Sequence, residues 1–409
     1  MSYNEEYSAA KDTPEAYWAG QVDRIKWYKK PETILSKTDH GTYKWYADGE
    51  LNSSYLALDW QLEQGRGEQV ALYYDSPVTR SKQAITYNEL TDKVARFAGA
   101  LQQQGVEKGD RVLIYMPMIP EMAAAFMAIA RLGAIAIPLF SGFAAPAIAL
   151  RLNDADVKAV VTATSTTRAG RKVNMVPALL EAVASAETVS TVLCLVRDED
   201  SLPDHPLVKD WKTEMEKASP ARQAALMTPT DPLFVAFTSG TTGKPKGVVQ
   251  NHIGILGKTA TDFTLCLDMK ESDRHMWMTD MGWVMGPLTL ISTSLVGATV
   301  ILAEGAPTHG EDPFRILRLV DELDITHMGI APTVARQLMT LDPSGMEGLS
   351  LASLRIVPST GEAWTPEAWH WTREHVCKNR AVPLNISGGT EMVGAIVTST
   401  VLQDIPPCG

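Results

Sequence analysis

A loop that could hold an anion follows the apolar stretch 232–237 and reads "TSGTTGKPKG" from Thr238 to Gly247. Backbone amides and hydroxyls between a strand and a following helix are suited to binding phosphate, so we expect that layout here. The loop is not a Walker A motif, because threonine and proline occupy positions 238 and 245 where that motif needs glycine and Ser/Thr. A flexible surface turn with solvated lysines is the alternative for a generic loop of this composition.

Four further short motifs follow the loop along the chain. They are "WMTDMGWVMG" (277–286), "APT" (331–333), "STGEAW" (359–364) and "SGGTEMVG" (387–394). The five motifs, in this order, resemble the signatures of the AMP-forming acyl-CoA synthetases, in the superfamily that also contains luciferases and peptide-synthetase adenylation domains. The resemblance covers nearly the whole chain and favours a nucleotide site over a flexible turn.

The resemblance implies ATP, Mg²⁺ and coenzyme A as ligands and assigns the nucleotide contacts. Thr390 would bond the α-phosphate, and Glu391 would ligate Mg²⁺, which prefers one or two carboxylates plus phosphate oxygens. Taken alone, Glu391 is more typical of a solvated loop acid, and the Gly-Gly-Thr-Glu context reverses that. The remaining implied ATP contacts are Thr238, Ser239, Gly240, Thr241, Thr242, Gly243 and Lys246 at the phosphates and Gly361, Glu362 and Ala363 at the adenine.

The chemistry implied is acid activation in two steps. A substrate carboxylate attacks the α-phosphate, so negative charge approaches negative charge, and hydroxyls, amides and a cation must stabilise the in-line transition state. No side-chain nucleophile is needed. Thr390, Glu391 and Lys246 are the residues to which the resemblance gives this catalytic role. A thiol then attacks the acyl-adenylate and releases AMP.

The acyl pocket departs from the short-chain pattern of this family. Acetyl-CoA synthetases carry a tryptophan two residues before the Thr-Glu pair, where this chain has Gly388. Losing an indole frees room for several methylenes, each able to contribute about 0.8 kcal/mol when buried, so we expect an acid larger than acetate. Another side chain refilling the space is the open alternative. The other expected walls are Trp283, Val284, Met285 and Thr360.

The front of the chain is similar to the acetyl- and propionyl-CoA synthetases in "YDSPVT", "VEKGDRVLIYMPMIPE" and "ARLGAI". In that subfamily two arginines contact the 3′-phosphate of coenzyme A, which assigns Arg168 and Arg171 of "TRAGRK" to this role. Gly142 and Ala331 are the other implied coenzyme A contacts. Two arginines three residues apart are otherwise typical of a solvated helix face.

Composition narrows the possible partners. The chain has 409 residues, a formal net charge of −11 and 45% hydrophobic residues, which favours a globular protein without a nucleic-acid surface. The apolar stretch 122–140 contains Arg131, Gly133 and Pro138, so it predicts a helix, a turn and a strand rather than a membrane span. Four scattered cysteines indicate a reducing compartment, and we expect a cytoplasmic protein whose oligomeric state, a homo-oligomer included, stays open.

Alternating apolar runs and helical periodicity predict an α/β fold of mostly parallel, helix-covered sheets. Thr86 and Glu89 predict a capping box at the start of a helix that ends at Gly105. Residues 1–80 are expected to wrap a core built elsewhere, 81–230 to form a first α/β subdomain, with a polar surface connection at about 197–230, and 231–409 a second.

The chain lacks strings that the family normally carries after these motifs. The resemblance includes a Thr-Gly-Asp motif, a hinge and a small C-terminal domain with a catalytic lysine, and the last lysine here is Lys378. We therefore expect a large N-terminal domain whose third, barrel-like subdomain is incomplete and which is poorly active alone. A non-catalytic nucleotide- or acyl-adenylate-binding module and an adenylation domain that loads a carrier protein remain the alternatives.

Overall fold

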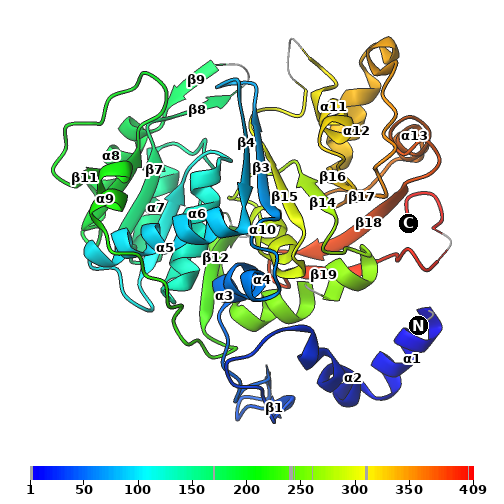
Figure 1. Cartoon of the computed structure of the whole chain (residues 1–409), viewed down its shortest axis with the longest axis horizontal. Coiled ribbons are helices and arrows are strands. Elements are labelled where there is room, and N and C mark those ends of the chain that lie inside the picture. Colours follow the sequence, from blue (N-terminus) through cyan, green and yellow to red (C-terminus); the bar gives the residue numbers. More distant parts are fainter. Residues whose placement is uncertain are drawn as a thin grey trace.

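The computed structural model describes residues 3–168, 171–238, 243, 245–259, 261–308, 312–403 and 405–409. Within them the chain builds two large, mostly parallel sheets covered by helices, which confirms the predicted α/β fold class (Figure 1). The helix that covers 120–131, at the start of the apolar stretch 122–140, is twelve residues long, and the described helices include none long and apolar enough to cross a bilayer.

The seven-stranded sheet has the order β11-β10-β7-β5-β6-β12-β13, and its neighbours are parallel except β12 and β13. Its strands are β5 (Arg111–Tyr115), β6 (Ile135–Pro138), β7 (Ala159–Ala163), β10 (Thr191–Leu195), β11 (Val208–Asp210), β12 (Pro232–Thr238) and β13 (Lys246–Asn251). Because helices cover both faces, β7 and β10 are buried at every position and read as continuous apolar runs.

The eight-stranded sheet has the order β19-β18-β17-β16-β14-β15-β3-β4, with antiparallel pairs only at its two edges. Its strands are β3 (Val70–Ser76), β4 (Ser81–Thr86), β14 (Arg274–Trp277), β15 (Thr299–Ala303), β16 (His327–Gly329), β17 (Ile356–Ser359), β18 (Val382–Gly389) and β19 (Gly394–Thr398). Two small hairpins lie outside the sheets, β1 (Leu35–Lys37) with β2 (Tyr43–Trp45) and β8 (Ser165–Arg168) with β9 (Arg171–Asn174).

The helices form layers on and between the sheets. One apolar core joins both sheets through α3 (Ser53–Ala57), α5 (Tyr87–Gln103), α6 (Pro120–Arg131) and α10 (Met285–Val296). A second core lies under α11 (Arg315–Glu322), α12 (Pro332–Met339) and α13 (Pro366–Trp371), and a third under α7 (Ala145–Asp154) and α8 (Val176–Val183). The other helical segments are α1 (Tyr3–Asp12), α2 (Pro14–Gln21), α4 (Asp59–Glu63), α9 (Trp211–Lys217), the 3₁₀ helices η1 (Val22–Arg24) and η4 (Pro343–Met346), and the π-helices η2 (Gly254–Thr259), η3 (Asp262–Cys266) and η5 (Thr372–Val376).

Helix α5 begins where its sequence predicts. The Thr86 hydroxyl accepts a hydrogen bond from the Glu89 amide, and the Glu89 carboxylate accepts one from the Thr86 amide, which completes the capping box. Beyond the other end, Gly105 has a φ of 80°, a left-handed conformation that glycine adopts without strain. The buried face contains Leu90, Val94, Phe97 and Leu101, as the helical spacing indicated.

Two local predictions were wrong. The phosphate loop is followed by strand β13, antiparallel to β12, and not by a helix. The alternation Val248, Gln250 in "KGVVQN" fits a hairpin strand, whereas glycine and proline in the loop suggested a helix start. The polar interval 197–230 also contains β11 and α9, because Trp211 stacks on Phe97 with ring centroids 3.6 Å apart and anchors α9 on α5.

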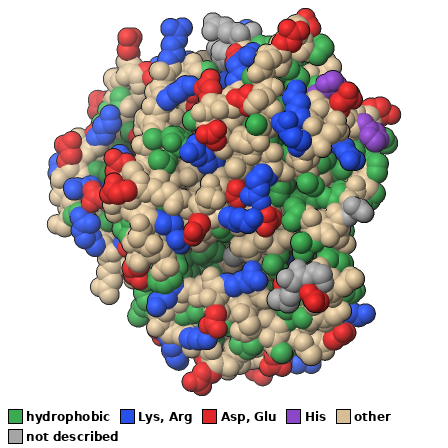
Figure 2. Space-filling model, turned by 45° about the vertical axis from the view of Figure 1, so that its right-hand side comes forward, with side chains coloured by type: hydrophobic (Ala, Val, Ile, Leu, Met, Phe, Trp, Pro, Cys, Tyr) green, Lys and Arg blue, Asp and Glu red, His purple; other side chains and the backbone are tan. Residues whose placement is uncertain are grey.

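The predicted divisions at residues 80 and 230 stay a prediction, and the sheets cross both of them. Strand β3 begins at Val70, inside the stretch expected to wrap, and it pairs with β15 of the second half of the chain. Strand β12 starts at Pro232 and pairs with β6 of the first half. On the face shown in Figure 2, acidic and basic side chains are interspersed rather than gathered by sign.

Candidate active site

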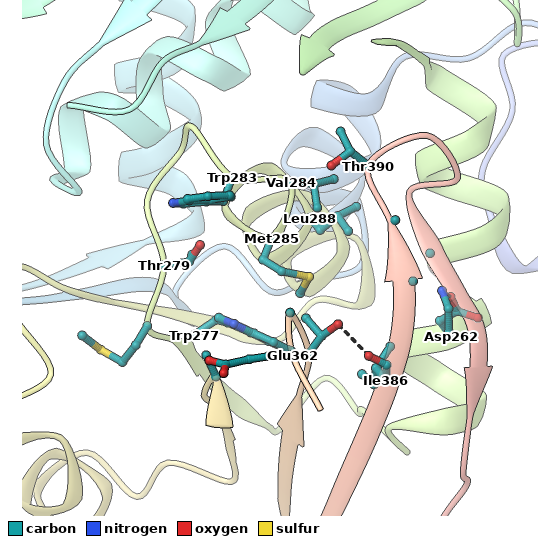
Figure 3. A pocket seen from close by; sticks show the side chains of 18 of the residues that line it. Asp262, Trp277, Thr279, Trp283, Val284, Met285, Leu288, Glu362, Ile386 and Thr390 are labelled. Carbon is teal, nitrogen blue, oxygen red and sulfur yellow. Dashed lines mark hydrogen bonds between the residues drawn. The ribbon is translucent and has the colours of Figure 1, made fainter. Parts of the chain in front are cut away.

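A cavity of about 690 Å³ opens among the segment that follows β14, the β18–β19 hairpin and π-helix η3 (Figure 3). All five residues expected to form the acyl pocket line it. Three residues from the nucleotide motifs, Gly361, Glu362 and Thr390, line the same cavity, as does Ala331, which had been assigned to coenzyme A.

The segment before α10 is held against the loop after β6. The Ser141 hydroxyl donates to the Asp280 carboxylate at 2.8 Å, and that carboxylate also accepts from the Gly282 amide at 2.9 Å. A Cβ at Gly282 would lie 2.3 Å from the Phe140 backbone nitrogen, so only glycine allows this approach. The contact fixes the start of the turn that carries Trp283, whose side chain is 65% exposed.

Thr360 is tied to the neighbouring strand at the base of the cavity. Its hydroxyl donates to the Ile386 carbonyl at 2.6 Å, shown as the dashed line in Figure 3. The hydroxyl is therefore engaged with the backbone, and the side chain presents its methyl group and stem as cavity wall.

Gly388 is a glycine for a reason that the motif did not indicate. A Cβ at this position would lie 2.4 Å from the Gly394 carbonyl oxygen of β19, and the hairpin register shifts between Ser387 and Gly388. The close approach of the two strands therefore requires a glycine at position 388. The same glycine also leaves this part of the cavity wall without a side chain. A tryptophan here could not be added without moving the hairpin.

Glu362 braces the turn expected to contact the adenine. Its carboxylate accepts from the Thr333 hydroxyl and the Thr333 amide (3.1 Å) at the start of α12, and from Arg336 in the last turn of that helix. The Thr333 hydroxyl, and with it Arg336, holds the pKa of the Glu362 carboxyl below its ordinary value. Gly361 makes this turn with a φ of 101°, which only glycine adopts readily. Ala363, next in the chain, is exposed and does not line the cavity.

Gln250, which lies outside the five motifs, holds the backbone at Thr390. The Gln250 side-chain amide, buried in β13, donates to the Thr390 carbonyl at 2.6 Å. This bond connects the strand after the phosphate loop to the Thr-Glu turn, 140 residues later. In the sequence, the signal for this contact is a glutamine on the side of "KGVVQN" that also carries Val248, where an apolar residue is expected.

Only the ends of the phosphate loop can be described. Thr238 and Lys246 are paired across β12 and β13, so they close the loop, and Gly243 has a φ of 85°. Ser239, Gly240, Thr241 and Thr242, which were also expected to contact the phosphates, lie outside the described residues. Lys246 is exposed at the start of β13.

Glu391 is a single carboxylate, which fits Mg²⁺ better than a metal ion that needs all its ligands from the protein. Glu391 is exposed at the β18–β19 turn, and the described residues contain no group of three His, Cys, Asp or Glu side chains that could enclose a metal. A single exposed carboxylate fits Mg²⁺ only where phosphates and water supply its other ligands.

The two arginines assigned to coenzyme A lie on a hairpin, not on a helix face. Arg168 of β8 and Arg171 of β9 are register partners at its end, so the backbone places them side by side. Arg171 is exposed, and Lys172 is paired with Asp200 at 2.6 Å. Gly142 is exposed beside Ser141 and Phe143, and neither Gly142 nor Arg171 lines the cavity.

Comparison with known proteins identifies the class. A family model described as AMP-binding enzyme matches residues 58–409, and one described as acetyl-coenzyme A synthetase N-terminus matches residues 3–57. Since the first match covers most of the chain, the chain belongs to the AMP-binding enzyme family. Within it, the chain corresponds to the N-terminal domain of an AMP-forming acyl-CoA synthetase, as its motifs implied.

Several relatives show how far the similarity extends. The chain is 38% identical to an uncharacterized protein of Pseudomonas aeruginosa, over 92% of this chain and 60% of that protein. It is 37% identical to an acetyl-coenzyme A synthetase of Marinomonas, over 99% of this chain and 63% of the relative. An acetoacetyl-CoA synthetase structure from Streptomyces lividans superposes with a TM-score of 0.90 at 23% identity, covering 98% of this chain and 61% of the other. The chain therefore spans about three fifths of the relatives it matches.

Proposed function

We propose that this chain supplies the nucleotide and acid sites for activating a small-to-medium carboxylic acid with ATP, which forms an acyl-adenylate and pyrophosphate. The acyl group then passes to coenzyme A with release of AMP, and the chain by itself is poorly active in this reaction. The observation that carries the proposal is the shared cavity. The acyl segment with Trp283 and Met285, the adenine turn with Gly361, and Thr390 all line it. An acyl-adenylate needs these three surfaces together, because its acyl group and its nucleotide are joined at one phosphate.

Each residue of the proposed site has a role that follows from its position. The Thr390 hydroxyl would donate to the α-phosphate, and Lys246 with the phosphate loop would hold the outgoing phosphates. Glu391 would hold Mg²⁺, which supplies charge neutralisation at the phosphates when bound. Gln250 and the Glu362–Arg336 pair act through the backbone that they position.

The acceptor in this proposal is coenzyme A rather than a carrier protein. Two arginines paired at the tip of the β8–β9 hairpin offer a compact site for a terminal phosphate. The proposed setting is the cytoplasm, where ATP and coenzyme A are present.

Thr390→Val tests the assignment of the phosphate. The substitution removes one donor and keeps the side-chain volume, so acid-dependent ATP–pyrophosphate exchange is expected to fall about 10²-fold. Thr340→Val is the matched control, because the Thr340 hydroxyl donates only to the Gln337 carbonyl at an exposed helix end among the contacts described. Exchange near the unmodified rate in Thr390→Val would show that the α-phosphate lies elsewhere, and formation of ADP and phosphate in place of AMP and pyrophosphate would contradict the reaction itself.

A further inference from the structure

The inner wall of the cavity comes from π-helix η3, which none of the five motifs covers. Asp262, Phe263, Cys266 and Leu267 face the cavity from this segment. Asp262 and Leu267 lie little more than one helical turn apart. The wider turn of a π-helix lets the side chains of this stretch point to the same face. The wall is apolar except at one end, where Asp262 supplies a carboxylate.

Asp262 lies against the β18–β19 hairpin (Figure 3) and lines the same cavity as Gly388. One carboxylate oxygen accepts from the Ala395 amide at 2.8 Å, and the other pairs with Lys258 one turn earlier. The Asp262 side chain is 13% exposed and that of Lys258 is 35% exposed. Of the two, the carboxylate faces the cavity.

The charges at this end favour a particular kind of acyl tail. The pairing with Lys258 compensates the charge of the Asp262 carboxylate, so neither a cation nor a second carboxylate on the acyl tail gains a strong ionic contact here. A carboxylate accepts about four hydrogen bonds, and the described residues supply two to Asp262. A methyl-terminated tail would cover the remaining acceptor positions without replacing their water, which is unfavourable.

We propose that Asp262 determines specificity at the acyl end of the site, and that the preferred substrate is an aliphatic acid carrying a distal hydroxyl group that donates to this carboxylate. The apolar walls of Phe263, Leu288 and Ile386 hold the methylenes of the tail, and the hydroxyl meets Asp262 beside Gly394. This inference rests on the proposed function, because it assumes that the cavity holds an acyl-adenylate.

Non-hydrolysable acyl-sulfamoyl adenosines test it by binding alone. Pairs of analogues are made with tails of increasing length, one of each pair ending in a hydroxyl and the other in a methyl group, and titrated calorimetrically into the 409-residue chain. At the best-fitting length the hydroxyl-ended analogue is expected to bind at least about tenfold more tightly. Equal or weaker binding of the hydroxyl-ended member at every length overturns the inference and leaves the proposed function intact. Failure of every analogue to bind removes the proposed function and the inference together.

Asp262→Asn separates recognition from bracing. The asparagine keeps a carbonyl oxygen for the Ala395 amide, so the hairpin is retained, and the charged acceptor is lost. The hydroxyl preference is expected to fall to about threefold or less while affinity for the methyl-ended analogue is kept. Asp39→Asn is the matched control and should keep the full preference, because Asp39 is exposed and does not line the cavity. Equal weakening of both analogues by Asp262→Asn would show that the carboxylate only braces the hairpin and would overturn the inference.

Discussion

At Gly388 the side chain is missing because the backbone of β19 occupies its place. The Gly394 carbonyl oxygen lies 2.4 Å from where a Cβ would stand, whereas a Cβ at the adjacent Gly389 would meet only the end of the Glu391 side chain, at 3.3 Å. The two glycines therefore have different physical roles, although they look equivalent in the motif.

Gly388→Ala is expected to destabilise the protein by about 1–3 kcal/mol, because backbone atoms of the hairpin must move to admit the methyl group. Gly389→Ala, the matched control, should change stability much less, since an exposed carboxylate can swing away. Urea unfolding followed by tryptophan fluorescence compares the two. A Gly388→Ala variant as stable as its control would mean that the hairpin is looser than its register indicates.

At the scale of elements, β13 positions two distant parts of the chain. Gln250 holds the Thr390 turn, and two residues later the buried His252 accepts from the Ser53 amide at 3.3 Å and contacts the Ser53 hydroxyl at 2.8 Å, at the start of α3. Burial, opposed by Asp231 and assisted by Lys108, lowers the pKa of His252 to about 4.

The His252 pKa predicts a loss of stability in mild acid. In the unfolded chain this histidine titrates near its ordinary pKa of about 6.5, so between pH 6.5 and 4 the unfolded state binds the proton and the folded state does not. The free energy of unfolding should fall by roughly 3 kcal/mol across that window as the pH is lowered, and then stay level with respect to this group. His252→Asn should flatten the slope, and His40→Asn, at an exposed position, should not. Identical slopes in the two variants would contradict the assignment.

The N-terminal segment supports the outer face of the same π-helix that lines the cavity. Arg24 of η1 donates to the Thr264 hydroxyl of η3 at 3.1 Å. Val22 and Ile25 of this segment belong to the core that also contains Ile253 and Leu256. Residues 22–25 therefore support the π-helix that lines the cavity.

Arg24→Ala is expected to loosen the inner wall and so to lower the ratio of kcat/KM between the best acid and its shorter neighbours by about threefold to tenfold. The KM for ATP should hardly change, because η3 does not contact the nucleotide motifs by any hydrogen bond described. Lys30→Ala is the control, since Lys30 pairs with Asp23 on the surface with both side chains mostly exposed. A change in ATP affinity without a change in acid preference would place the effect of Arg24 elsewhere.

Across the whole molecule, a buried polar network joins the two large sheets. Arg197, in the loop after β10, forms a bidentate pair with Glu304 after β15, with bonds of 2.7 and 3.0 Å. The Tyr74 and Ser76 hydroxyls of β3 donate to the same carboxylate, and burial beside it raises the pKa of the Tyr74 phenol. Glu304 precedes Gly305 of the cavity wall, so the network also fixes one side of the site.

Arg197→Met is expected to cost about 3–5 kcal/mol of stability, because it leaves the Glu304 charge buried without its cation. The double variant Arg197→Met with Glu304→Gln should recover part of that loss, since the uncompensated charge is gone. The free energies of unfolding of the two single variants and the double variant test this coupling. If the losses in unfolding free energy of the two single variants summed to that of the double variant, Arg197 and Glu304 would not be coupled energetically.

The fold class could be predicted from the sequence, because hydrophobic periodicity depends on neighbouring residues. The helix and strand predicted within 122–140 and the capping box at Thr86 are cases in point. The strand that follows the phosphate loop could not be predicted from the sequence. Its residues pair with β12, but the same glycines and lysines also allow a helix to start there.

The sequence by itself determined the family, because its motifs are contiguous strings of residues that can be recognised without the fold. Tertiary structure alone decided which distant residues complete the site: Gln250 beside Thr390, Asp262 beside Ala395, and Arg24 beside Thr264, separated by 140, 133 and 240 residues. The physical reason is that these contacts arise from the packing of two sheets and a π-helix against one another. No single stretch of residues carries the position of its partner in another layer.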